Sequence, residues 1–173
     1  MNVATQGLTA LRSAFDQTFA APARGRVEDL VSLLTIDIGN HPFALRTAEL
    51  SGLVADRRVV PVPSRRPELL GLIGLRGTLV PVFDLARLLG VPRHDPEPRW
   101  LALADRENPV AFAFDRLEGY IDVPPACLYA GVTELRQPCV GHLVQAGPVV
   151  RGLIELPPLI ETIRKESMAR GRR

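Results

Sequence analysis

The sequence predicts an all-β fold with short helices, built as two small β-barrels packed side by side, with a further helix at each end of the chain. Three observations predict it: short alternating apolar segments broken by Gly and Pro, a weak internal repeat, and a length of 173 residues. A chain of this length buries about 70% of its unfolded surface, so it needs no disulfide or metal to form a core. The 46% hydrophobic and 23% charged residues exclude whole-chain disorder.

Residues 1–28 predict an amphipathic helix followed by a linker. Large apolar side chains recur there at helical spacing, at Leu8, Leu11, Phe15 and Phe19. Pro22 and Gly25 end the helix. The apolar face has two possible destinations, the body of the protein or a partner. If it packs on the body, deletion of residues 1–28 is expected to lower the stability.

The first predicted strands follow from residue 30. Leu34, Ile36 and Ile38 alternate with their neighbours, and Gly39-Asn40 predicts a hairpin turn because both residues tolerate a positive φ. The prolines between residues 59 and 63 are typical of a strand edge or end, since proline has no amide donor for a sheet.

A second hairpin is predicted at Leu69–Leu75 and Thr78–Val82, on either side of Arg76-Gly77. Asp84 is the expected N-cap of a short helix that ends at Gly90. Capping residues at both ends define this helix more sharply than its few apolar positions do.

The second half of the chain repeats the first. With Pro42 set on Pro109, Ala44 falls on Ala111 and Gly52 on Gly119; with Gly71 set on Gly141, the following residues also correspond. The order of these matches indicates an internal duplication. The predicted boundaries are a domain at 29–166, with halves at about 30–95 and 98–166, and a basic tail at 167–173.

Charge and motifs exclude several classes of function. The net positive charge comes from the C-terminal segment 164–173, and no basic stripe is interleaved with aromatic residues, so we expect no binding to nucleic acid. No apolar run approaches the ~18 residues of a membrane span, which predicts a cytoplasmic protein without direct membrane insertion.

Phosphate-binding and nucleophile-elbow motifs are absent from the sequence. The histidines and cysteines lack metal-ligand spacing, and no cofactor is expected. Cys139 with His142 is the single candidate nucleophile and base, a less favoured alternative.

The segment from Val60 to Leu89 resembles the CheW family of chemotaxis adaptor proteins. The resemblance is carried by Pro63, Pro67, Gly71-Leu72-Ile73, Leu75-Arg76-Gly77, Val80-Pro81-Val82 and Asp84-Leu85. It extends over roughly residues 30–166. The family fold that it implies is a pair of five-stranded β-barrels around a shared hydrophobic interface.

The resemblance also implies a function without catalysis. Family members couple chemoreceptors to a CheA-type histidine kinase in arrays below the membrane. They bind the kinase's regulatory domain and the hairpin tip of the receptor's helical bundle. The alternative within the same class is a divergent accessory scaffold that has lost one of these partners.

Five residues are the predicted partner-binding positions: Leu50, Leu53, Leu75, Arg76 and Gly77. The leucines supply apolar surface for a docking helix, and the Arg76 guanidinium suits a carboxylate or a carbonyl. Two departures from the family bear on this site. Gly74 stands where the family usually has Asn, and Gly52 stands where it commonly has a Glu that pairs with the turn arginine. The nearest acid is Glu49, so that ion pair is expected to be lost or moved.

Overall fold

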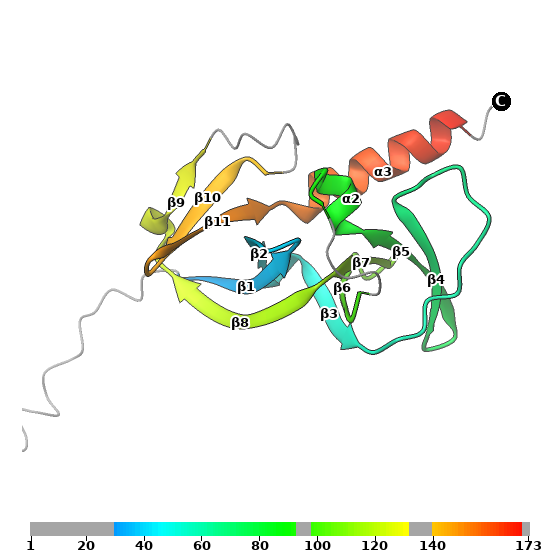
Figure 1. The fold of residues 1–173 in the computed structure, drawn as a ribbon, viewed down its shortest axis with the longest axis horizontal. Helices are drawn as coiled ribbons and strands as arrows, with labels where there is room; N and C mark the ends of the chain where they lie inside the picture. Colours follow the sequence, from blue (N-terminus) through cyan, green and yellow to red (C-terminus); the bar gives the residue numbers. More distant parts are fainter. Residues whose placement is uncertain (1–29, 93–97, 132–139, 171–173) are drawn as a thin grey trace, which may run out of the picture.

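In the computed structural model, which describes residues 30–92, 98–131 and 140–170, the chain forms two β-sheets that lie side by side (Figure 1). Sheet A has the strand order β8-β1-β2-β11-β10-β9. Its strands are β1 (Val31–Ile38), β2 (His41–Arg46), β8 (Arg116–Val123), β9 (Leu128–Ala130), β10 (His142–Ala146) and β11 (Val149–Ile154). The predicted all-β class is confirmed. Sheet A has six strands instead of the expected five, because the three-residue strand β9 pairs with the edge of β10.

Sheet B has the strand order β3-β6-β7-β5-β4. Its strands are β3 (Leu50–Ala55), β4 (Leu69–Leu75), β5 (Thr78–Asp84), β6 (Trp100–Ala104) and β7 (Val110–Phe114). The helices are the 3-10 turns η1 (Thr47–Glu49) and η2 (Pro125–Cys127), and the α-helices α2 (Leu85–Leu89) and α3 (Leu156–Arg170).

The local predictions in the first half of the chain are confirmed. Gly39 and Asn40 both have positive φ, 56° and 64°, and join β1 to β2. The Asp84 carboxylate accepts a hydrogen bond from the Ala86 amide at 3.0 Å and so caps α2. Gly90, at φ 64°, ends that helix in the left-handed conformation.

The two sheets differ in how the chain supplies them. Sheet B comes from one continuous stretch, residues 50–114, and sheet A from the stretches that flank it. Neither sheet is therefore made from one predicted half alone. The strand orders nevertheless correspond when β1 is set on β6, β2 on β7, β3 on β8, β4 on β10 and β5 on β11. Ala44 and Ala111 then take the same place, opposite Leu153 and Val82 in parallel strand pairs.

Three apolar clusters hold the sheets together. Sheet A encloses Leu33, Ala44, Val123, Val144 and Leu153. Sheet B encloses Ile73, Val80, Val82, Leu101, Leu103, Ala111 and Ala113. The largest cluster lies between the sheets and includes Phe43, Phe112, Phe114 and the buried face of α3. Both faces of the central strands are buried. One face is covered within its own sheet, and the other is covered by packing against the second sheet.

One arginine fastens the long connection before β4 to helix α3. Arg66 donates to Glu68 at 2.8 Å, to Glu166 at 2.9 Å and to the Ile163 carbonyl at 3.0 Å. Its guanidinium also lies 5.3 Å from the centre of the Phe83 ring. Helix α3 continues to Arg170, so the predicted start of the basic tail falls inside the helix. The predicted N-terminal helix lies outside the described residues.

Candidate functional site

A groove opens beside sheet B, between strand β3 and the β4–β5 hairpin. Its volume is about 570 Å³. Apolar side chains form much of its wall, and two arginines stand with them. The groove is lined by Ser51, Gly52, Leu53, Val54, Leu75, Arg76, Thr78, Val80, Leu103, Arg106 and Pro109. A groove of this composition suits an amphipathic helix better than a small polar substrate.

Arg76 occupies the two-residue turn of the β4–β5 hairpin. Its φ is 49°, and Gly77 follows at 83°, so both turn residues are left-handed. This conformation matches the twist of the hairpin and favours the glycine at the second position. The Arg76 side chain is exposed and makes no hydrogen bond or ion pair with any residue that the structure describes. The ion pair of the turn arginine, which was expected to be lost or moved, is therefore absent among the described residues.

The carboxylates that could have neutralised the groove are engaged elsewhere. Glu49 accepts a hydrogen bond from the Leu156 amide at 2.8 Å, and its other oxygen lies 3.5 Å from Arg46. It therefore caps the start of α3 and does not reach Arg76. Asp105 lies beside Arg106 in the chain, but it binds Arg164 at 2.6 Å. That hydrogen bond holds the pKa of the Asp105 carboxyl below its ordinary value of 3.8.

The structure brings together part of the predicted site. Leu53, Leu75 and Arg76 line the groove, and Gly77 completes the same turn. Leu50 is not among the lining residues; its half-buried side chain packs against the central core. A Cβ atom at Gly52 would lie 3.3 Å from the Leu103 Cδ1 methyl, so a side chain there would project into the groove.

Arg106 is the groove residue that sequence reasoning missed. It follows β6 in the loop to β7, about thirty residues after the Arg76 turn. Its place in the groove comes from the pairing of β3 with β6, which sets the β6–β7 loop beside β3. An exposed arginine in a polar loop carries no local signal of that pairing.

The outer face of the β4–β5 hairpin is a second, apolar surface. Strand alternation turns Leu72, Leu79 and Pro81 away from the groove-lining Leu75 and Val80. Val60 extends the surface, since it forms a bridge with Leu72. Leu79 is 69% exposed and Val60 57%, which is unusual for large apolar side chains in one patch. We call these four residues the outer strip. One hairpin thus presents two different surfaces, one on each face.

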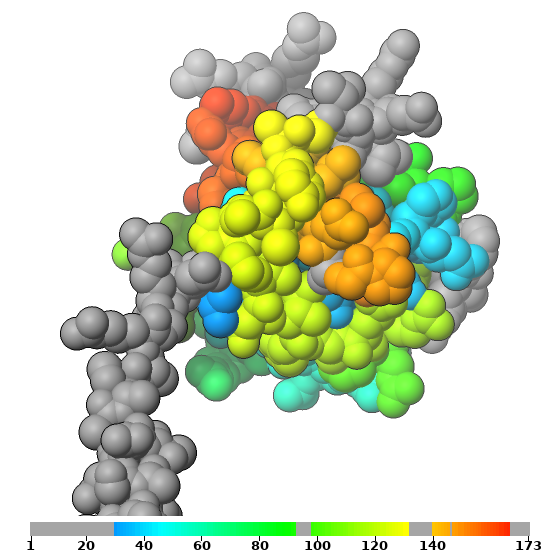
Figure 2. Space-filling model, turned by 90° about the vertical axis from the view of Figure 1, so that its left-hand side faces the viewer, coloured from blue at the N-terminus to red at the C-terminus, as the bar shows by residue number. Residues whose placement is uncertain are grey.

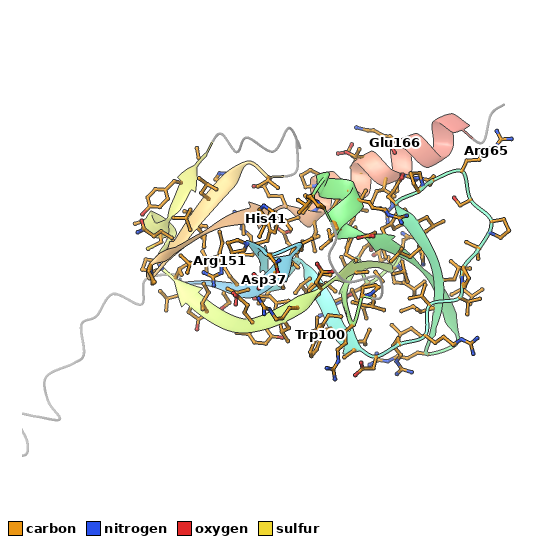
Figure 3. The ribbon with its side chains drawn as sticks, viewed as in Figure 1. Asp37, His41, Arg65, Trp100, Arg151 and Glu166 are labelled. Atoms are coloured by element: carbon orange, nitrogen blue, oxygen red, sulfur yellow. The ribbon has the colours of Figure 1, made fainter. Side chains whose placement is uncertain are left out.

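The equivalent region of sheet A holds an in-chain ion pair. Arg151 on β11, which is labelled in Figure 3, binds Glu118 on β8 at 2.6 Å. The Arg151 side chain is only 11% exposed. Seen from the side of sheet A, strands β8 to β11 form one packed surface of yellow and orange side chains (Figure 2).

The described residues offer little support for the Cys139–His142 alternative. His142 Nδ1 lies 2.8 Å from Glu155 Oε1, and Cys139 lies outside the described residues. Cys127 is a free, half-buried cysteine. Within the described ranges, no three His, Cys, Asp or Glu side chains gather as metal ligands. None of the helices in those ranges is long and apolar enough to cross a membrane.

Two joined sheets, a groove with apolar walls and an exposed apolar strip define a module that binds other proteins. The CheW-like domain model matches residues 32–147. The chain belongs to the family of CheW-like domains, a family of non-enzymatic adaptors.

The relatives agree with this assignment. The chemotaxis protein CheW of Thermotoga maritima is 26% identical over 92 residues, which are 53% of this chain and 61% of that protein. The chemotaxis protein CheW of Bacillus subtilis is 25% identical over 93 residues, 53% of this chain and 60% of that protein. The chain thus spans about three fifths of the curated relatives it matches.

A solved structure shares the fold. The crystal structure of the scaffolding protein TtCheW from Thermoanaerobacter tengcongensis superposes with a TM-score of 0.67 at 15% sequence identity. The match covers 73% of this chain and 89% of that one. The predicted resemblance to the CheW family is confirmed.

Proposed function

We propose that this protein is a chemotaxis adaptor that couples chemoreceptors to a CheA-type histidine kinase. The groove takes the helical hairpin tip of the receptor, and the outer strip takes the regulatory domain of the kinase. Arg76, Leu53 and Leu75 carry the receptor contact, with Gly77 fixing the turn. The adaptor itself stays outside the membrane and is recruited to receptor arrays by these contacts.

The single observation that carries this proposal is that the β4–β5 hairpin borders a groove on one face and carries an exposed apolar strip on the other. A coupling protein must hold two partners at once, so its two surfaces must not overlap. The groove wall and the outer strip share two strands but no side chains. In this proposal both partners are bound together, one on each face of the same hairpin.

The competing proposal is an accessory scaffold that has lost one partner. Gly52 is the observation that favours it, because Gly52 lines the groove at a position where the family commonly has a Glu. In the family, that Glu commonly pairs with the turn arginine. A receptor that recognises this ion pair would bind the groove of this protein poorly. The coupling adaptor and the accessory scaffold are distinguished by which partners the protein binds.

The test is a pair of calorimetric titrations of the full chain, made without ATP. One uses the regulatory domain of a CheA-type kinase, and the other a soluble receptor hairpin fragment, both from the same cell. Coupling predicts binding to each, and a ternary complex when all three are mixed. If one partner shows no binding at concentrations of tens of micromolar, the accessory scaffold is the better description of this protein.

Variants then assign the two surfaces. Leu79→Asp on the outer strip is expected to weaken the kinase titration and spare the receptor titration. Arg76→Glu in the groove is expected to do the reverse. Arg58→Gln, an exposed arginine outside both surfaces, is the control. If Leu79→Asp and Arg76→Glu each weakened both titrations equally, the assignment of separate surfaces would be wrong.

A further inference from the structure

We infer that the helix which docks in the groove presents acidic side chains, and that Arg76 and Arg106 bind them together. This inference rests on the proposed function, since it names the chemistry of the partner at that same site. Arg106 is assigned here as a second residue that determines specificity.

The charge of the groove is the first step. Among the described residues that line it there is no Asp or Glu, whereas two are arginines. Both guanidinium groups are exposed, and neither pairs with a residue that the structure describes. Two unpaired cations at one groove favour an anionic partner and repel a cationic one.

The fate of the nearby carboxylates is the second step. Asp105 is a direct neighbour of Arg106, yet its carboxylate binds Arg164 and accepts from the Glu107 and Asn108 amides at 3.0 and 3.1 Å. Glu49 is held at the start of α3. These contacts hold both acids away from the groove, so the missing negative charge must come from the partner.

The walls of the groove are the third step. Leu53, Leu75 and Leu103 give it an apolar interior, with the two arginines as polar lining. A helix that fits this pattern has an apolar stripe flanked by Glu or Asp. Arginine suits this role because its planar fork can bind a carboxylate through two hydrogen bonds. A nucleic acid would also supply anions, but these apolar walls offer no aromatic side chain on which a base could stack.

The test is a titration of the full chain with the soluble receptor hairpin fragment at about 0.1 M and about 1 M NaCl, because salt shortens the Debye length from roughly 10 Å to 3 Å over this range. The variants are Arg76→Gln, Arg106→Gln and Gly52→Glu, which places a carboxylate in the groove of the protein itself. Arg58→Gln is the matched control. A second receptor fragment has the acidic residues of its tip changed to Gln.

We expect each groove variant to weaken binding about fivefold at low salt, in the range of charge pairs at interfaces. The control is expected to bind as the unmodified protein does. The differences are expected to shrink at high salt, and the acid-free fragment is expected to respond little to Arg106→Gln. If the unmodified protein binds but Arg106→Gln binds equally tightly at low salt, the inference is wrong while the proposed function stands. If the unmodified protein does not bind the fragment at all, the receptor contact and the inference are both overturned.

Discussion

The same structural position is treated differently in the two sheets. In sheet A, the space between β8 and the β10–β11 hairpin is occupied by the Arg151–Glu118 ion pair. In sheet B, the corresponding space between β3 and the β4–β5 hairpin is a groove of about 570 Å³ with two arginines that pair with no described residue. An arginine next to an in-chain carboxylate serves the fold of this molecule. An arginine without one remains available to another molecule.

The comparison also separates a residue that stabilises the fold from a residue that binds a partner. Arg151 is nearly buried, so its charge must be compensated within the chain. Arg76 is exposed, and water solvates its charge until a partner arrives. The first arginine is therefore expected to matter for stability and the second for affinity. Four predictions test how the two sheets differ, and two of them concern these arginines directly.

The largest effect is expected where sequence-aligned glycines differ in their surroundings. A Cβ at Gly71 would lie 2.1 Å from the Val60 carbonyl oxygen, and its φ of 150° disfavours a side chain. Gly141 has open space around it. Gly71→Ala is expected to lower the free energy of unfolding by more than about 3 kcal/mol, and Gly141→Ala to change it by less than about 0.5 kcal/mol. Urea denaturation measures both, and equal midpoints would show that the two sites are alike.

The second effect concerns the ion pair of sheet A. Glu118→Gln leaves the Arg151 charge almost buried and without its anion, and Arg151 Nε already lacks a partner among the described residues. Because Glu118 is itself partly exposed, we expect a loss of about 2 kcal/mol in the free energy of unfolding, less than for a fully buried pair. Adding Arg151→Met should restore most of that loss. A double variant as unstable as the single one would contradict this account.

The third effect concerns Arg76 in sheet B, the arginine that is compared with Arg151. Arg76→Ala removes no ion pair that the structure describes, so the free energy of unfolding is expected to change by less than about 0.5 kcal/mol. Binding to the receptor fragment should weaken instead. Thermal denaturation and the calorimetric titrations report the two quantities separately. A large fall in the melting temperature would reveal a structural role for Arg76.

The smallest effect is a pH dependence at Asp105, the neighbour of the groove residue Arg106. The hydrogen bond from Arg164 lowers the pKa of Asp105 in the folded state. Its stabilising contribution is therefore present above the unfolded pKa of about 4 and is lost as the pH falls through the folded pKa. Arg164→Gln is expected to raise the Asp105 pKa towards its ordinary value, measured by NMR titration. An unchanged pKa would mean that the amides of Glu107 and Asn108 alone hold the carboxylate charged.

Sequence reasoning succeeded where a local residue dictates the backbone. Gly39-Asn40 predicted its turn and Asp84 with Gly90 predicted α2, because left-handed φ values and caps depend on a few adjacent residues. It failed for β9, whose three residues are too few to show a period of two.

The candidate site was predicted only in part for a related reason. Arg76 and Leu75 belong to a specific motif, whereas Arg106 reaches the groove through the pairing of β3 with β6. The use of Glu49 as a cap for α3 also joins residues far apart in the chain. Long-range pairing of this kind is visible in coordinates and not in one unaligned sequence.

The continuous origin of sheet B has a consequence for the order of folding during synthesis. All five of its strands have been made once Phe114 leaves the ribosome, whereas sheet A must wait for β11. Contacts in sheet A span long stretches, as between Ser32 and Asp122, which are 90 residues apart. Closing such long loops is slow. Until β11 has been made, strand β2 lacks its second neighbour, and apolar side chains of the β1–β2 hairpin are exposed to other nascent chains. Completion of sheet A is therefore the step at which this protein is most vulnerable to aggregation.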